Sequence, residues 1–137
     1  MKVELAEKMA RQHHAGQTDK LGHDYIHHVE RVVELVKGDL TAETVAWLHD
    51  LVEDTDVTIE NLRLLGFSEE VVQAVAMLTR QEDKTYSAYI QSLLLMGSPV
   101  ARLVKTADLI DHLRPGCPEK LRSRYEHALI ALAMAGV

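Results

Sequence analysis

The segment that decides the fold is residues 42–54, which read AETVAWLHDLVED. Apolar residues occupy nearly every position from Val45 to Leu51, so little of the segment's surface is polar, and Thr41 is a suitable N-cap just before it. The segment predicts a helix from Ala42 to about Val52. Because neighbours must cover such a helix on most sides, we expect it to be the buried centre of the molecule.

Outside this segment, apolar residues recur at helical spacing almost everywhere, and alternation with a period of two is absent. Glycine, proline and N-capping residues divide the chain into further segments. The expected helices span residues 2–14, 25–36, 42–52, 59–65, 69–78, 86–96, 99–113 and 119–135. The sequence therefore predicts an all-α helical bundle of about seven or eight helices, formed as a single domain by residues 1–137.

Composition limits the classes of partner. The chain has 137 residues, of which 47% are hydrophobic and 26% charged, which suits one globular core. Its net charge is -6, and lysine and arginine form no basic stripe. Because a nucleic-acid backbone is bound mainly by such stripes, we expect no DNA or RNA partner.

The redox and targeting signals favour the cytoplasm. Cys117 is the only cysteine, so no internal disulfide can form. The first residues are charged and amphipathic and lack the apolar run of a signal peptide or a membrane span. We expect a cytoplasmic protein without a membrane partner; the oligomeric state is left open.

Polar residues interrupt the buried segments at three places. His49 and Asp50 end the most apolar helix, His28 opens a valine-rich helix, and Asp108 lies within the apolar run of residues 100–107. An unpaired buried charge is costly, and a bound metal ion is one way to pair such groups. Two imidazoles and two carboxylates suit Mn²⁺, Fe²⁺, Zn²⁺ or Ni²⁺.

The order of these residues resembles the HD superfamily of metal-dependent phosphohydrolases. The motifs Y-I-x-H at residues 25–28, H-D-x-x-E-D-T at 49–55 and K-x-A-D at 105–108 look like the hydrolase domain of RelA/SpoT-type alarmone enzymes and their small stand-alone relatives. The resemblance covers about residues 6–114. It implies an all-helical HD-type phosphohydrolase domain that binds Mn²⁺ and removes the 3′-pyrophosphate from guanosine tetra- or pentaphosphate, a small nucleotide substrate.

The resemblance also implies roles for single residues. The metal ligands would be His28, His49, Asp50 and Asp108. Glu53 and Asp54 would be the catalytic acid/base pair, since a carboxylate one helical turn from the metal can orient water or protonate the leaving oxygen. Apart from the resemblance, we expect Lys20, Lys105 and Arg114 to bind substrate phosphates by their positive charge, and His112 to line the substrate pocket.

Three departures from the family pattern leave the substrate open. Asp19 stands where the family usually has an arginine that packs on the guanine base. His112, which follows Asp111, stands where the family has an asparagine, and Val29 stands where a proline is usual. The alternatives are an HD phosphohydrolase of another nucleotide or a phosphomonoester, a catalytically silent module that binds metal or nucleotide, and a structural protein without metal.

Single residues also have simpler interpretations. One isolated histidine is more often structural than a ligand, and Glu53-Asp54 could be solvated residues at a helix end. His27 is expected to face away from His28, and Asp111-His112 either lines the pocket or is polar surface. The run of residues 93–96 is expected in the core. The histidines predicted at the surface are His13, His14, His23 and His127.

Overall fold

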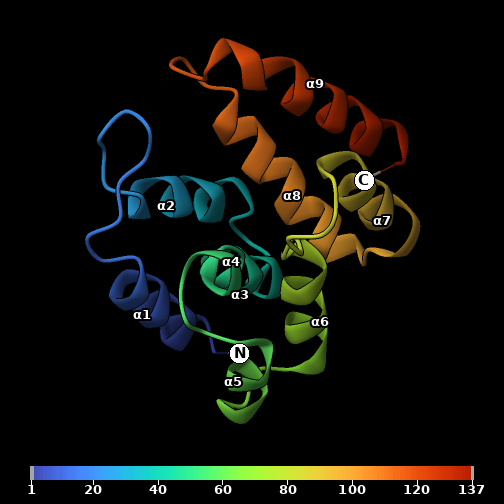
Figure 1. Ribbon diagram of the computed structural model, residues 1–137. Helices are drawn as coiled ribbons and strands as arrows, with labels where there is room; N and C mark the ends of the chain where they lie inside the picture. The colour runs from blue at the N-terminus through green and yellow to red at the C-terminus, as the bar shows by residue number, and fades with distance from the viewer. Residues whose placement is uncertain (1, 137) are drawn as a thin grey trace.

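The structure, a computed structural model, describes residues 2–136 and contains nine helices and no strand within that range (Figure 1). The all-α prediction is confirmed. The helices are α1 (Val3–His13), α2 (Ile26–Leu35), α3 (Leu40–Leu48), α4 (Leu51–Asp54), α5 (Ile59–Leu64), α6 (Glu69–Leu78), α7 (Tyr86–Met96), α8 (Pro99–His112) and α9 (Glu119–Met134).

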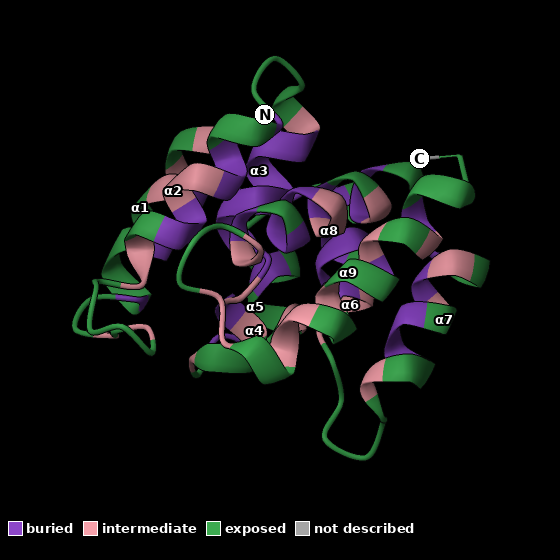
Figure 2. Cartoon of the chain, turned by 90° about the horizontal axis from the view of Figure 1, so that it is seen from above, coloured by how far each residue is buried: buried purple, intermediate pink, exposed green. Residues whose placement is uncertain are grey.

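Helix α3 is the centre of the bundle, as its composition predicted. It packs against α1, α2, α6 and α8, and every residue from Ala42 to Leu48 is buried. Figure 1 shows α1 and α2 on one side of it and α6 on the other, while α8 lies above it in this view and runs up towards the start of α9. Figure 2 shows the buried surface concentrated on α3 and on the facing sides of its neighbours. The site described below lies where α2, α3 and α8 meet.

Side-chain caps fix where several helices begin. Asp39, Thr58, Ser68, Thr85 and Ser98 each accept a hydrogen bond from a backbone amide in the first turn of the following helix. The prediction of Thr41 as the cap of the central helix was wrong. Asp39 takes that role, so α3 begins at Leu40 and is longer at its N-terminus than the apolar pattern indicated.

At its C-terminal end the central helix is shorter than predicted, because the chain breaks at His49 and Asp50 into α3 and α4. In a continuous helix the Ala46 carbonyl would accept the amide of Asp50. Here the Ala46 carbonyl instead accepts hydrogen bonds from His49 Nδ1, at 2.6 Å, and from the His49 backbone amide. The imidazole thus takes a backbone acceptor, and the chain turns before α4 begins at Leu51.

Two further expectations need correction. His14 was predicted at the surface but is only 1% exposed, because it packs against Tyr25 and bonds to Gln17. The run of residues 93–96 is not uniformly core: Leu93 is buried, whereas Leu95 and Met96 are exposed. Within residues 2–136, none of the helices combines the length and the hydrophobicity needed to cross a membrane.

Candidate metal centre

The four residues predicted as metal ligands meet at one point of the fold. His28 lies in the first turn of α2, His49 and Asp50 form the break between α3 and α4, and Asp108 lies in α8. Each offers one ligand atom, and these four atoms all lie within 4.8 Å of one another. Because α2, the break between α3 and α4, and α8 supply them, the bundle itself brings the donors together.

The contacts within this group are short and buried. Asp108 Oδ1 lies 2.9 Å from His28 Nε2 and 3.3 Å from His49 Nε2. Asp50 Oδ2 lies 2.9 Å from His49 Nε2 and 3.8 Å from His28 Nε2. His28, His49 and Asp108 are buried, while Asp50 is half-buried. The cluster is therefore largely removed from solvent.

The other nitrogen of each ring is already engaged. His49 Nδ1 donates to the Ala46 carbonyl at 2.6 Å, and His28 Nδ1 lies 2.6 Å from Asp111 Oδ2. A neutral imidazole carries one N–H, so donation from Nδ1 leaves the Nε2 lone pair facing the carboxylates. Four lone-pair donors then converge, an arrangement that a cation satisfies and that matches the way proteins orient metal-binding histidines. The residues fit a divalent transition metal of mixed nitrogen and oxygen preference.

The electrostatics of the cluster also favour positive charge. Burial alone lowers the pKa of His28, but hydrogen bonds to Asp108 and Asp111 outweigh it and raise the pKa to about 9. Burial also lowers the pKa of His49, but the charge of Asp50 outweighs burial and raises this pKa. Burial raises the pKa of Asp50, yet the charge of His49 dominates and lowers it. The two carboxylates thus make this a site that attracts cations.

Two residues that support the ligands were not assigned from the sequence. Tyr25 donates its hydroxyl to Asp50 Oδ2 at 2.5 Å, and Asp111 joins His28 to Arg31, whose Nε lies 2.6 Å from Asp111 Oδ1. A signal was available for both. Tyr25 belongs to the Y-I-x-H motif, and Asp111 follows Asp108 by three residues, which places the two carboxylates on one face of α8.

Glu53 and Asp54 lie beside the centre on α4. Both residues are exposed overall and line a shallow cavity together with Arg80. Glu53 Oε1 accepts a hydrogen bond from the backbone amide of Arg80. Partial burial of the carboxyl groups, with the nearby charge of Asp50, raises the pKa of Glu53 and raises that of Asp54 to about 6. Either group can thus carry a proton closer to neutral pH than an ordinary carboxyl group.

Three of the four predicted substrate-binding residues line one cavity. Lys20, His112 and Arg114 border a space of about 370 Å³ that reaches His28. The ring of His112 stacks on that of His28 with centroids 4.5 Å apart, and its Nε2 lies 3.2 Å from Asp108 Oδ1. His112 therefore faces both the cavity and the centre.

The fourth predicted residue, Lys105, is not among the residues that line this cavity. Its ammonium lies 2.8 Å from Asp108 Oδ2, and its side chain is 12% exposed. Burial lowers the pKa of Lys105, but the charge of Asp108 outweighs burial and raises it. Asp19 also lines the cavity, where its carboxylate accepts the amides of Leu21 and His23 and so shapes the loop.

Comparison with known proteins agrees with this geometry. The human guanosine-3′,5′-bis(diphosphate) 3′-pyrophosphohydrolase MESH1 is 35% identical to the chain over an alignment of 123 residues, and this alignment covers 82% of this chain and 67% of the human protein. The chain belongs to this pyrophosphohydrolase family. A solved structure, described as a metazoan ortholog of SpoT that hydrolyzes ppGpp and plays a role in starvation responses, superposes with a TM-score of 0.80 at 25% identity. The superposition covers 98% of this chain and 84% of the chain in that solved structure.

Other members of the pyrophosphohydrolase family are much longer. The Vibrio cholerae guanosine-3′,5′-bis(diphosphate) 3′-pyrophosphohydrolase is 44% identical over an alignment of 117 residues, and this alignment covers 77% of this chain but 17% of that protein. The chain spans 15% of a Synechocystis relative named as a probable enzyme of the same activity. No protein-family model matches the chain. The similarity thus covers most of this chain and only one region of the longest relatives.

Proposed function

We propose that the protein hydrolyses the 3′-pyrophosphate ester of guanosine 3′,5′-bis(diphosphate), adding water to give GDP and pyrophosphate. One observation carries the proposal: two imidazoles and two carboxylates converge within 4.8 Å beside the carboxyl groups of Glu53 and Asp54. Relatives that share most of this chain's length are named for the same reaction.

The ligand set that we propose is His28, His49, Asp50 and Asp108, and the metal that we propose is Mn²⁺. A mixed nitrogen and oxygen set supports this choice, since thiolates are absent from the four donors and pure oxygen sites suit harder ions. When bound, a divalent cation acidifies water and offsets the negative charge of a phosphate group.

Glu53 and Asp54 are the acid/base pair in this proposal. The Arg80 amide holds Glu53 Oε1, which leaves Oε2 to take a proton from the attacking water or to give one to the leaving oxygen. Asp54, with a pKa of about 6, is partly protonated near neutral pH and assists. The raised pKa of both groups suits a task that requires gaining and losing a proton.

The cavity beside His28 is the proposed nucleotide site. Lys20 and Arg114 provide positive charge at its border for the 5′-diphosphate, and His112 links the cavity to the centre. A small nucleotide, and no nucleic acid, is the proposed partner, in keeping with the net charge of -6. A cytoplasmic location is also proposed, because the single Cys117 suits a reducing compartment.

A substrate panel with Mn²⁺ tests the proposal. The purified protein is incubated with guanosine tetraphosphate, deoxynucleoside triphosphates and nucleoside monophosphates, and products are separated by ion exchange. We expect GDP and pyrophosphate from the first substrate. Turnover of another nucleotide alone would favour the alternative HD phosphohydrolase, and no turnover of any substrate at high protein concentration would refute an enzymatic role.

A further inference from the structure

Three cationic side chains surround the ring of Tyr86, outside the set of residues assigned above to the nucleotide cavity. The Cζ atoms of Arg80 and Arg124 lie 5.6 and 4.9 Å from the ring centroid, and Lys105 Nζ lies 5.8 Å from it. The loop after α6, helix α8 and helix α9 each contribute one of them. We call Arg80, Lys105 and Arg124 with Tyr86 the Tyr86 cation cluster. Three cationic side chains thus converge on one ring in a chain whose net charge is -6.

The two arginines of the cluster have no acidic partner within residues 2–136. Arg80 donates its Nε to the backbone carbonyl of Lys84, and no carboxylate pairs with Arg124 in that range. Three other arginines, Arg11, Arg31 and Arg63, do pair with carboxylates. A cation over an aromatic ring gains little when it stays solvated, and like charges around one ring repel. An anion with several oxygens would relieve that repulsion.

The cluster adjoins the metal centre on two sides. Lys105 bonds to the ligand Asp108 at 2.8 Å, and the backbone amide of Arg80 bonds to Glu53. An anion held by the cluster therefore lies next to both a proposed ligand and the proposed acid/base residue. The cluster is an extension of the centre and not an isolated surface patch.

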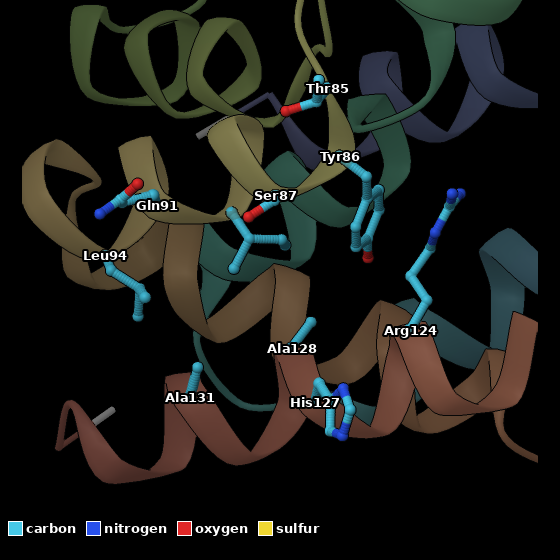
Figure 3. A pocket seen from close by; sticks show the side chains of 10 residues that line it. Thr85, Tyr86, Ser87, Gln91, Leu94, Arg124, His127, Ala128 and Ala131 are labelled. Carbon is cyan, nitrogen blue, oxygen red and sulfur yellow. The ribbon is translucent and has the colours of Figure 1, made fainter.

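Open space and an unpaired polar atom lie on the Arg124 side of the ring. Tyr86 and Arg124 border a cavity of about 630 Å³ between α7 and α9, and Figure 3 shows the Arg124 side chain extending from α9 alongside the Tyr86 ring. The Tyr86 hydroxyl oxygen is buried and has no hydrogen-bond partner in the described part of the chain. Buried polar atoms are nearly always paired, so this hydroxyl lacks the partner that such a group usually has.

We infer that the Tyr86 cation cluster binds the distal phosphate of a 3′-diphosphate while the proximal phosphate lies at the metal centre. The inference rests on the proposed function and names the class of group that the site selects: a diphosphate ester over a monophosphate ester. Guanidinium groups suit it, since they bind phosphate through paired hydrogen bonds. A monophosphate ester would leave Arg80 and Arg124 unused.

The kinetic test compares two substrates that differ only in the 3′ group, guanosine 5′-diphosphate with a 3′-diphosphate or a 3′-monophosphate. The variants are Arg80→Gln, Arg124→Gln and their double variant. We expect the double variant to lose about 10- to 100-fold in kcat/KM for the diphosphate ester and to change little for the monophosphate ester. Equal losses for both substrates, or no loss, would overturn the inference. Arg122→Gln, on the same helix but outside the cluster, is the matched control.

A binding test separates this inference from the proposed function. Methylenediphosphonate, which cannot be hydrolysed at its P–C–P bridge, is titrated calorimetrically into Mn²⁺-loaded protein. Its contact with the metal is common to all variants, so any difference between them reports Arg80 and Arg124. Arginine-dependent binding without ppGpp turnover would reject the proposed substrate and retain the diphosphate site. Turnover with binding that is equal in wild type and double variant would reject the diphosphate site alone.

Discussion

The orientation of His28 and His49 depends on residues outside the proposed ligand set. His49 is held by the Ala46 carbonyl and His28 by Asp111, so both rings present Nε2 to the carboxylates. Tyr25 similarly holds Asp50 through its hydroxyl. If they bind a metal as proposed, side chains fixed in this way lose little freedom on binding, which favours affinity.

Metal binding and proton transfer should be separable by mutation. We expect Asp108→Ala, and the closer isostere Asp108→Asn, to lose bound metal and activity together. Glu53→Gln should keep the metal and lower kcat by about 10²- to 10⁴-fold, because it removes only a proton-transfer group. Elemental analysis and turnover assays measure both effects. Equal loss of metal in the Asp108 and Glu53 variants would contradict the division into ligands and acid/base residues.

Asp111 should act on the metal through His28. Asp111→Asn removes the charge that pairs with the ring and with Arg31, and we expect metal affinity to fall about 10- to 100-fold, as for other residues that orient a ligand. Competition with a chromophoric chelator measures the affinity without an activity assay. Asp83→Asn, in an exposed loop, is the control. Unchanged affinity in Asp111→Asn would show that Arg31 and Asp111 serve packing only.

How far the sequence predicted these positions depended on the residue. The cluster of possible metal ligands could be predicted because a histidine or an aspartate stands out in an apolar helix, as His49 does after Leu48. His14 and Lys105 could not be placed, because each packs against a ring from another part of the chain, His14 against Tyr25 and Lys105 against Tyr89. Such long-range pairs leave no periodic signal in one sequence.

Among the elements, α3 and α4 show the same limit. The hydrophobic pattern predicted one helix through residues 42–52. The break between α3 and α4 is explained by the hydrogen bond from His49 to the Ala46 carbonyl, which the pattern does not reveal. The break has a consequence for the site. It turns the chain so that Asp50 joins the centre while Glu53 and Asp54 lie in the separate helical turn α4 beside it.

The cap of α8 should contribute to stability without contributing to metal binding. Ser98 accepts the Ala101 amide at the start of the helix that carries Asp108 and Asp111. We expect Ser98→Ala to lower the free energy of unfolding by about 1 kcal/mol and the Tm by roughly 3–6 °C. Denaturation followed by circular dichroism measures this change. Ser123→Ala, at an exposed position in the middle of α9, should change stability by less than about 0.5 kcal/mol. Similar losses in the two variants would contradict a specific capping role.

For the whole molecule, the centre joins helices that lie far apart in the chain. His28 in α2 and Asp108 in α8 are separated by 80 residues, yet their side chains lie 2.9 Å apart. Unfolding separates these donors, so the unfolded chain cannot offer the assembled site. Binding to the folded state alone must therefore raise stability in proportion to the logarithm of metal concentration.

We expect Mn²⁺ at about 100 times its Kd to stabilise the folded protein by roughly 2.7 kcal/mol, which corresponds to a rise in Tm on the order of 10 °C. Differential scanning calorimetry at several Mn²⁺ concentrations, with a chelator as the zero point, measures the shift. Glu53→Gln should keep the full shift because it retains all four ligands, whereas Asp108→Asn should lose it. A shift of equal size in Asp108→Asn would mean that the ion binds elsewhere on the molecule, and the convergence of α2, α3 and α8 would then need another explanation.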